Sequence, residues 1–135
     1  MSQERYPVLW IGQVAVVTLP VEIDVTNADA VGEELLAVLN RNTALLVADM
    51  TNTNFCDSSG VSALVRVFRR AAGSGQAMRL AVSTPAVKRV LSITGVDRLV
   101  NVYSSVAASL GDPSGHPDQA RPEGATAKAD TDGGA

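Results

Sequence analysis

Residues 44–61 read ALLVADMTNTNFCDSSGV and connect an apolar run to the start of a helix. Ala44–Ala48 is short and continuously apolar, which is typical of a strand covered on both faces of a sheet. The polar segment Asp49–Val61 that follows would then leave the carboxyl end of a central strand. In parallel sheets, ligands and partners are commonly met at that edge.

Strand and helix patterns alternate on both sides of this segment. Val8–Ile11 and Val14–Leu19 flank Gly12-Gln13, a pair that suits a type II′ hairpin turn. The further predicted elements are helices at about 27–41 and 58–72, a strand at Met78–Val82, a helix from Pro85 to the cap Gly95, an edge strand at Leu99–Tyr103 and a short helix through Leu110. This alternation predicts an α/β domain with right-handed crossovers and a largely parallel sheet.

Helical spacing also predicts which faces are buried. The helix at 27–41 begins with a capping-box pattern, Thr26 and Asp29, and its predicted buried stripe is Val31, Leu35, Val38 and Leu39. The predicted buried stripe of the helix at 58–72 is Val61, Leu64, Val65, Phe68 and Ala72.

The composition, with 46% hydrophobic and 19% charged residues, is typical of a soluble globular protein. A length of 135 residues predicts one domain. Residues 1–110 carry nine acidic and nine basic side chains, whereas residues 111–135 carry five and two, a net charge of −3. A body without net positive charge argues against nucleic acid as a partner. Residues 111–135 contain no large apolar side chain and are predicted to form a disordered acidic tail.

The single cysteine, Cys56, excludes an internal disulfide and favours a reduced, cytoplasmic compartment. Beside Asp57, it is expected to be a small buried side chain and not a redox sensor. The N-terminus lacks the pattern of a signal peptide, and the most apolar stretch, Val8–Leu19, is too short to span a bilayer. Membrane insertion is therefore not expected.

Catalytic chemistry finds little support in the residue types. The one histidine, His116, falls in the predicted tail, which removes the base that Ser-His catalysis requires. No spacing of ligands suggests a metal site, and neither a P-loop nor a dinucleotide fingerprint occurs. We predict no catalytic residue, no metal and no cofactor.

Two interpretations of Asp57-Ser58-Ser59-Gly60 remain open at this point. In the structural one, Asp57 or Ser58 caps a helix and Phe55 fills the core. In the functional one, Ser58 is a phosphorylation site at a helix N-terminus, where the positive end of the dipole tolerates a phosphate. The phosphate would add about −1.5 to −2 charges beside Asp57 and repel a partner docked there.

The helix that follows offers a candidate surface for such a partner. Its predicted outer face consists of Ser59, Ala63, Arg66, Val67 and Arg70. Ala63 and Val67 are apolar, and an outward position for them would indicate an interface.

Three stretches make the chain resemble the STAS-domain anti-sigma factor antagonists, the anti-anti-sigma factors of bacteria. They are Phe55-Cys-Asp-Ser-Ser-Gly-Val61, Ser83-Thr-Pro-Ala-Val-Lys-Arg-Val-Leu-Ser-Ile-Thr-Gly-Val96 and Glu22-Ile-Asp24. The resemblance covers about residues 8–110. The chain departs from the family where Val21, after Pro20, stands in place of the usual Gly.

The resemblance implies a STAS domain at residues 1–110, with a mixed sheet of about four or five strands and about four helices largely on one side. It also implies a partner that is both an anti-sigma factor and a serine kinase. The unmodified antagonist would bind this partner and free a sigma factor, phosphorylation of Ser58 would release it, and a serine phosphatase would reset it. Asp24 and Asp57 match acidic positions near the partner surface, and the outer face of the second helix matches the docking side.

Two other functions stay open. The chain could be a structural or accessory STAS subunit of a signalling assembly or a lipid-transport complex, with no phosphate cycle. An enzyme that carries phosphoserine at Ser58 is a third reading, although no acid-base partner is visible in the sequence. The expected state in solution is a monomer or a weak dimer.

Overall fold

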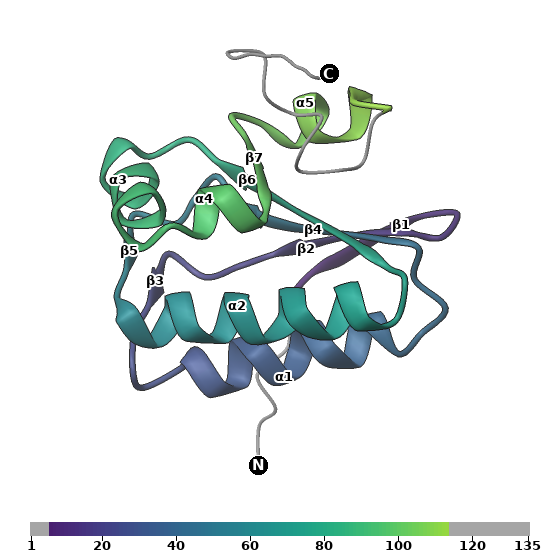
Figure 1. The fold of residues 1–135 in the computed structure, drawn as a ribbon, viewed down its shortest axis with the longest axis horizontal. Helices are drawn as coiled ribbons and strands as arrows, with labels where there is room; N and C mark the ends of the chain where they lie inside the picture. Colours follow the sequence, from purple (N-terminus) through teal and green to yellow (C-terminus); the bar gives the residue numbers. More distant parts are fainter. Residues whose placement is uncertain (1–5, 114–135) are drawn as a thin grey trace.

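The computed structural model describes residues 6–113, so His116 and most of the predicted tail lie outside the described residues. Its main sheet has five strands in the order β1-β2-β4-β6-β7 (Figure 1). The strands are β1 (Val8–Ile11), β2 (Val14–Thr18), β4 (Leu45–Met50), β6 (Ala77–Val82) and β7 (Asn101–Tyr103). Only the β1–β2 pairing is antiparallel, so the predicted largely parallel sheet with β4 at its centre is confirmed.

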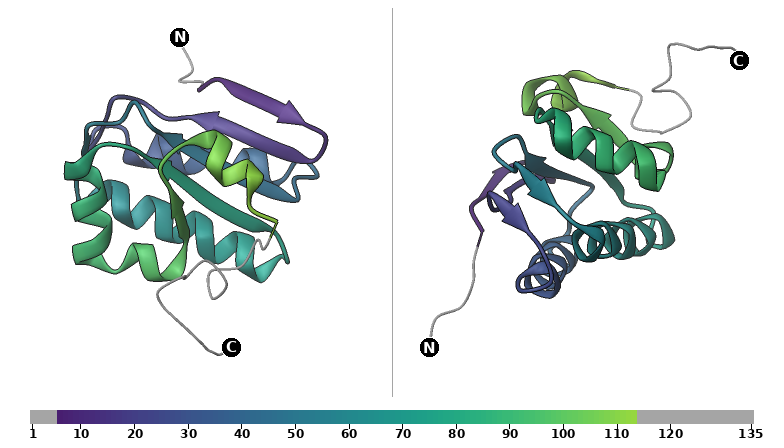
Figure 2. Two further views of the ribbon diagram at one scale, coloured as in Figure 1. Left: turned by 90° about the horizontal axis from the view of Figure 1, so that it is seen from above. Right: turned by 90° about the vertical axis from the view of Figure 1, so that its left-hand side faces the viewer.

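Helices cover both faces of this sheet. The long helices α1 (Ala28–Leu39) and α2 (Ser58–Gly73) pack together on one face, and the short α5 (Val106–Gly111) lies on the other (Figures 1 and 2). Helices α3 (Pro85–Thr94) and α4 (Val96–Leu99) sit at one end. The α/β class is confirmed. Helix α4 was not predicted, and it contains Leu99, which was expected to begin the last strand.

The opening hairpin forms as predicted. Ile11 pairs with Val14 across Gly12 and Gln13. Gly12 has a φ of +60°, whereas Gln13 keeps a negative φ, as a type II′ turn requires.

A second, two-stranded sheet was not predicted. Its strands β3 (Glu22–Ile23) and β5 (Phe55–Cys56) run parallel, with Ile23 opposite Cys56. The backbone N–H of Asn54 donates to the Val21 carbonyl at 2.8 Å, which extends the pairing by one step. Strands of two residues are too short to show the alternation by which a strand is recognised in sequence.

The buried face of α2 differs from the prediction. Val61 and Leu64 are buried as expected, but Ala63 and Val67, predicted to point outward, are buried as well, and Ala72 is exposed. The reason is that α2 packs against α1 in addition to the sheet, which buries a wider arc of the helix than one stripe. The predicted outer apolar face of Ala63 and Val67 therefore does not exist.

Two local predictions near these helices were also wrong. No capping box forms at α1, because the Thr26 hydroxyl donates to the Asp24 carboxylate and Asn27 is the residue before the helix. Phe55 does not fill the core, since 49% of it is exposed. The buried residues of the small sheet are Ile23 and Cys56. The predicted buried stripe of α1, by contrast, is confirmed.

Under α5, the sheet carries a polar cluster around Arg79, which is buried on β6. Its guanidinium donates to the Ser109 carbonyl and lies 5.6 Å from the centre of the Tyr103 ring. The Tyr103 hydroxyl donates to the Asp112 carboxylate at 2.5 Å. This bond ties β7 to Asp112, the residue that follows α5. Within residues 6–113, every helix is too short or too polar to cross a membrane.

Candidate functional site

Ser58 is the first residue of α2, and its side chain is exposed. Asp57 precedes it with extended backbone, and its carboxylate accepts hydrogen bonds from the N–H groups of Ser59 at 2.9 Å and Gly60 at 3.2 Å. Asp57 is thus the N-cap of α2. The capping role predicted for Asp57 is confirmed, and the Ser58 hydroxyl is left facing solvent.

The small sheet brings a second carboxylate to this place. The backbone N–H of Asp57 donates to the Ile23 carbonyl at 3.1 Å, so Asp24 and Asp57 follow their strands at the same edge. In Figure 1 this edge lies at the end of α2 that begins with Ser58. The structure therefore brings together four of the residues predicted for the site: Asp24, Asp57, Ser58 and Ser59.

Asp24 is held in a tight turn. Its Oδ1 accepts a hydrogen bond from the Thr26 hydroxyl at 2.5 Å and another from the Thr26 backbone N–H at 2.9 Å. These two bonds, the side-chain bond first, lower the pKa of Asp24 below its ordinary value of 3.8. Asp24 therefore carries a negative charge at neutral pH.

Gly60 is required by the packing behind the serine. Its Cα faces the side chains of Ile23 and Cys56, which leave no room for a β-carbon. The Cys56 thiol is buried there, as the sequence predicted. Its burial, and then the negative charge of Asp57, raise the pKa of Cys56 to about 11. Cys56 is therefore a neutral thiol at physiological pH.

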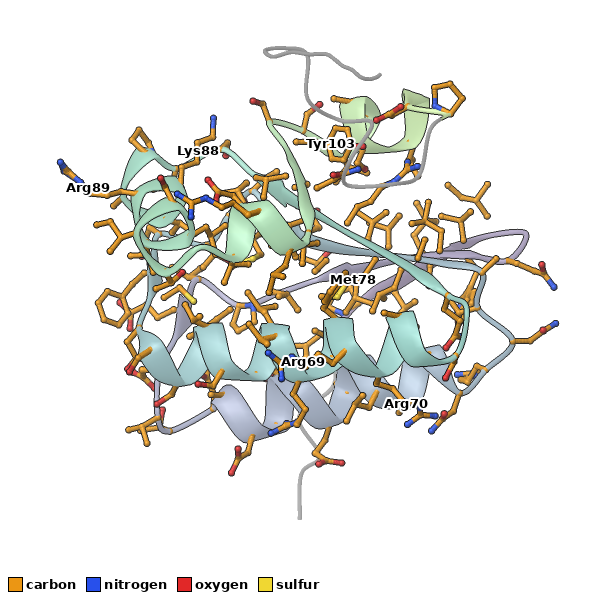
Figure 3. All side chains as sticks on the ribbon, in the orientation of Figure 1. Arg69, Arg70, Met78, Lys88, Arg89 and Tyr103 are labelled. Atoms are coloured by element: carbon orange, nitrogen blue, oxygen red, sulfur yellow. The ribbon has the colours of Figure 1, made fainter. Side chains whose placement is uncertain are left out.

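The two arginines predicted for the partner surface lie further along α2. Arg66 and Arg70 are exposed, about 12 and 18 Å from Ser58 along the helix axis. The Arg66 guanidinium lies over Gly32 of α1, and that of Arg70 donates to the Asn40 side chain. Figure 3 shows Arg69 and Arg70 on this helix. The positive side chains thus form part of the α1–α2 surface. They lie away from the edge formed by Asp24, Asp57, Ser58 and Ser59, which we call the serine edge.

Apolar side chains at the serine edge were missed by the sequence analysis. Phe55 precedes Asp57 and is 49% exposed, and Val25 follows Asp24 and is 76% exposed. Phe55 also lines a pocket of about 670 Å³ between β5 and α3. Val21, at the other end of β3, is exposed as well. For Val25, the signal that could have found it is an apolar residue directly beside an acidic one, between a strand and a helix. Phe55 has no such signal, because Asn54 and Cys56 are its neighbours.

Metal chemistry finds no site in the described part of the chain. Among residues 6–113, no three His, Cys, Asp or Glu side chains gather closely enough to hold a metal ion. The site thus offers an exposed hydroxyl, two carboxylates and a few exposed apolar side chains, which is the chemistry of a recognition surface.

A family model of the STAS domain matches residues 7–109, and the chain belongs to this family. Its fold is similar to that of an anti-sigma factor antagonist from Mycobacterium paratuberculosis, with 25% identity, a TM-score of 0.72 and coverage of 78% of this chain and 89% of that one. An anti-sigma-factor antagonist (STAS) domain protein from Planctomyces limnophilus gives 23% identity, a TM-score of 0.68 and coverage of 81% and 97%.

The same fold also occurs within a much larger protein. The murine anion transporter Slc26a9 matches 74% of this chain at 21% identity and a TM-score of 0.63, over 17% of the transporter's own length. No curated protein matches the sequence.

Proposed function

We propose that this protein is an anti-sigma factor antagonist that is switched by phosphorylation of Ser58. In the unphosphorylated form it binds an anti-sigma factor that is also a serine kinase, and thereby frees a sigma factor for transcription. A serine phosphatase restores the binding form. The observation that carries this proposal is the exposed Ser58 hydroxyl on the first residue of a 16-residue helix, beside the carboxylates of Asp57 and Asp24.

The charges at this edge support a switch that acts by repulsion. Asp57 already accepts the N–H groups of Ser59 and Gly60, so a phosphate on Ser58 would not find these donors free. It would stand in solvent beside Asp57 and add about −1.5 to −2 charges. A partner that docks against the bare serine would then face an unpaired anion, which costs roughly 2 to 5 kcal/mol at an interface.

The partner surface proposed from the structure differs from the one the sequence suggested. Its centre is Ser58 with Asp24, Asp57 and Ser59, and its apolar part is Phe55 and Val25, because both are exposed next to the carboxylates. Ala63 and Val67 leave the proposed surface because they are buried. Arg66 and Arg70 stay as candidates for contacts at its outer margin on α2.

The direct test is phosphorylation of the full chain. The protein is incubated with its cognate kinase and ATP, and the phosphate is located by mass spectrometry of the peptides. We expect one phosphate on Ser58 and none on Ser59 or Ser62, the nearest other serines. Label elsewhere without label on Ser58 would reject the site.

An accessory STAS subunit without a phosphate cycle is the alternative, and the occurrence of this fold in a transporter is the observation in its favour. Purification of the protein from its source cell distinguishes the two functions. Stable copurification with transporter subunits, and no phosphate on Ser58, would favour the accessory role.

A further inference from the structure

The outer edge of β1 is the most exposed apolar part of the main sheet. β1 is the first strand in the sheet order, and among residues 6–113 only β2 pairs with it. Leu9 is 60% exposed and Ile11 49% exposed. Exposed edge strands usually carry a charge, a proline or a bulge that prevents pairing with another chain. The four residues of β1, VLWI, include no charged residue and no proline.

Along β1, backbone groups that bond to β2 alternate with backbone groups that have no partner among residues 6–113. The Thr18 N–H donates to the Pro7 carbonyl at 2.9 Å, which makes Pro7 and Thr18 a hydrogen-bonded pair. Because such pairs alternate in an antiparallel ladder, Leu9 and Ile11 also bond to β2. The N–H and C=O groups of Val8 and Trp10 therefore point away from β2, toward the outer edge.

The side chains of β1 divide between the two faces of the sheet. Trp10 lies opposite Ala15 on the face that α1 and α2 cover. There the Arg41 guanidinium lies over the Trp10 ring, 5.6 Å from its centre. Leu9 lies opposite Val16, on the face that α5 covers only in part. Figure 2 shows α5 over the middle of the sheet, and it leaves β1 uncovered. The open side of the edge is therefore formed by Leu9 and Ile11.

From this pattern we propose that β1 pairs with β1 of a second copy of the chain. The backbone groups of Val8 and Trp10 point to the outer edge, and those of Leu9 between them point to β2. This pattern is complementary to a second copy of itself that is related by a two-fold axis. With the axis at Leu9, Val8 of each copy exchanges two hydrogen bonds with Trp10 of the other, four bonds in total. Leu9 then faces its own counterpart on the exposed side, and the two main sheets become continuous.

The pairing geometry also determines how tightly the two copies bind and where their Ser58 residues lie. Four residues from each copy bury far less than the roughly 1,600 Å² of a standard interface, so the dimer depends on concentration. Antiparallel pairing turns the carboxyl ends of β4 in the two copies in opposite directions. The two Ser58 edges therefore lie at opposite ends of the joined sheet, and dimer formation leaves both open.

Disulfide trapping in the full chain tests the proposed register. In the antiparallel pair, the Cα atoms of Leu9 and its counterpart would be about 4.5 Å apart, within reach of a disulfide. The Ile11 pair would be about 13 Å apart, since four residues of strand separate them. With oxidised glutathione, Leu9→Cys is expected to form a linked dimer at least about tenfold faster than Ile11→Cys. The buried Cys56 remains in both variants and serves as the common background.

Sedimentation of the native chain gives a second measurement. We expect the mass to rise from 14.0 kDa toward twice that value as concentration increases. Leu9→Lys places like charges opposite each other and should weaken the dimer about tenfold or more. Equal cross-linking at positions 9 and 11, a dimer that Leu9→Lys leaves unchanged, or a native chain that stays monomeric at high concentration would each overturn the proposal.

Discussion

Gly60 lies directly against Ile23. A β-carbon on Gly60 would come within 2.8 Å of the Ile23 Cγ2 atom and 2.6 Å of the Cys56 Sγ atom. The glycine that ends Asp57-Ser58-Ser59-Gly60 is therefore a packing requirement, because it lets α2 start against the small sheet. Through this contact, the helix that bears the serine is fixed relative to the strand that bears Asp24.

Gly60→Ala should destabilise the fold. Neither neighbour is a flexible chain end, so the added methyl group is expected to cost about 1 to 3 kcal/mol in the free energy of unfolding, measured by urea denaturation. Gly73→Ala is the control, since nothing lies within 4 Å of a β-carbon at that position of the same helix. Equal stabilities of the two variants would contradict the packing argument.

Charge at position 58 should control binding of the proposed anti-sigma factor partner. Ser58→Ala is expected to bind like the native chain, whereas Ser58→Asp should bind at least about tenfold more weakly, because it adds part of the phosphate's charge next to Asp57. Titration calorimetry with the purified partner gives both affinities.

Ser74→Asp supplies the matched control for this experiment. It makes the same substitution at the other end of α2, about 24 Å away along the axis. The switch is rejected if Ser58→Asp and Ser58→Ala bind equally well, and a loss of binding in Ser74→Asp would show an effect of net charge alone.

The Cys56 thiol should be unreactive in the native protein. Its pKa of about 11 leaves almost no thiolate at pH 8, and the side chain is buried. Alkylation by iodoacetamide, followed by mass spectrometry, should be slow in buffer and fast in concentrated urea. Equal rates in the two solutions would show that the thiol is accessible.

The same shift predicts a dependence of stability on pH. The folded pKa lies above the ordinary value of 9.0, so the unfolded chain loses the proton first. Below pH 9 the stabilising effect is complete, and it is lost as the pH rises from about 9 to about 11. Cys56→Ala should lack this component of the decline when unfolding is followed across that range.

Thr26 should control the ionisation of Asp24. Thr26→Val removes the hydroxyl that makes the main contribution to the lowered pKa of Asp24, so this pKa should rise toward 3.8 without reaching it, because the backbone bond remains. Thr26→Ser keeps the hydroxyl and should leave the pKa low. Carboxyl chemical shifts measured against pH give the values, and an unchanged pKa in Thr26→Val would contradict this assignment.

In the native chain the lowered pKa of Asp24 also makes stability depend on pH. A lowered folded pKa stabilises the fold above pH 3.8, and the contribution is lost as the pH falls through the folded value. Thr26→Val should therefore lose less stability in acid than the native chain does.

Elements with long, regular patterns could be predicted from sequence. The apolar run at β4, the stripe of Val31 and Leu35 in α1 and the Gly12-Gln13 turn are local signals, and each formed as expected. The cap of α2 is also a local signal, because Asp57 bonds to residues only two and three positions further on. Sequence also predicted that the peptide around Ser58 begins a helix at the carboxyl end of the central strand.

The remaining features depend on contacts between distant residues. Ala63 and Val67 are buried by α1, about 30 residues earlier in the chain, and no helical period reveals a second packing partner. Likewise, Asp24 meets Asp57 only because β3 pairs with β5. The size and apolar character of Phe55 predict a core position for it, but Cys56 takes the inward position.

The separation of β3 and β5 from the five-stranded sheet has an evolutionary consequence. Substitutions at Val25 alter the outline of the serine edge without disturbing the strands that carry the core. Gene duplicates with this fold can diverge there in turn, so that one scaffold can carry several different recognition edges.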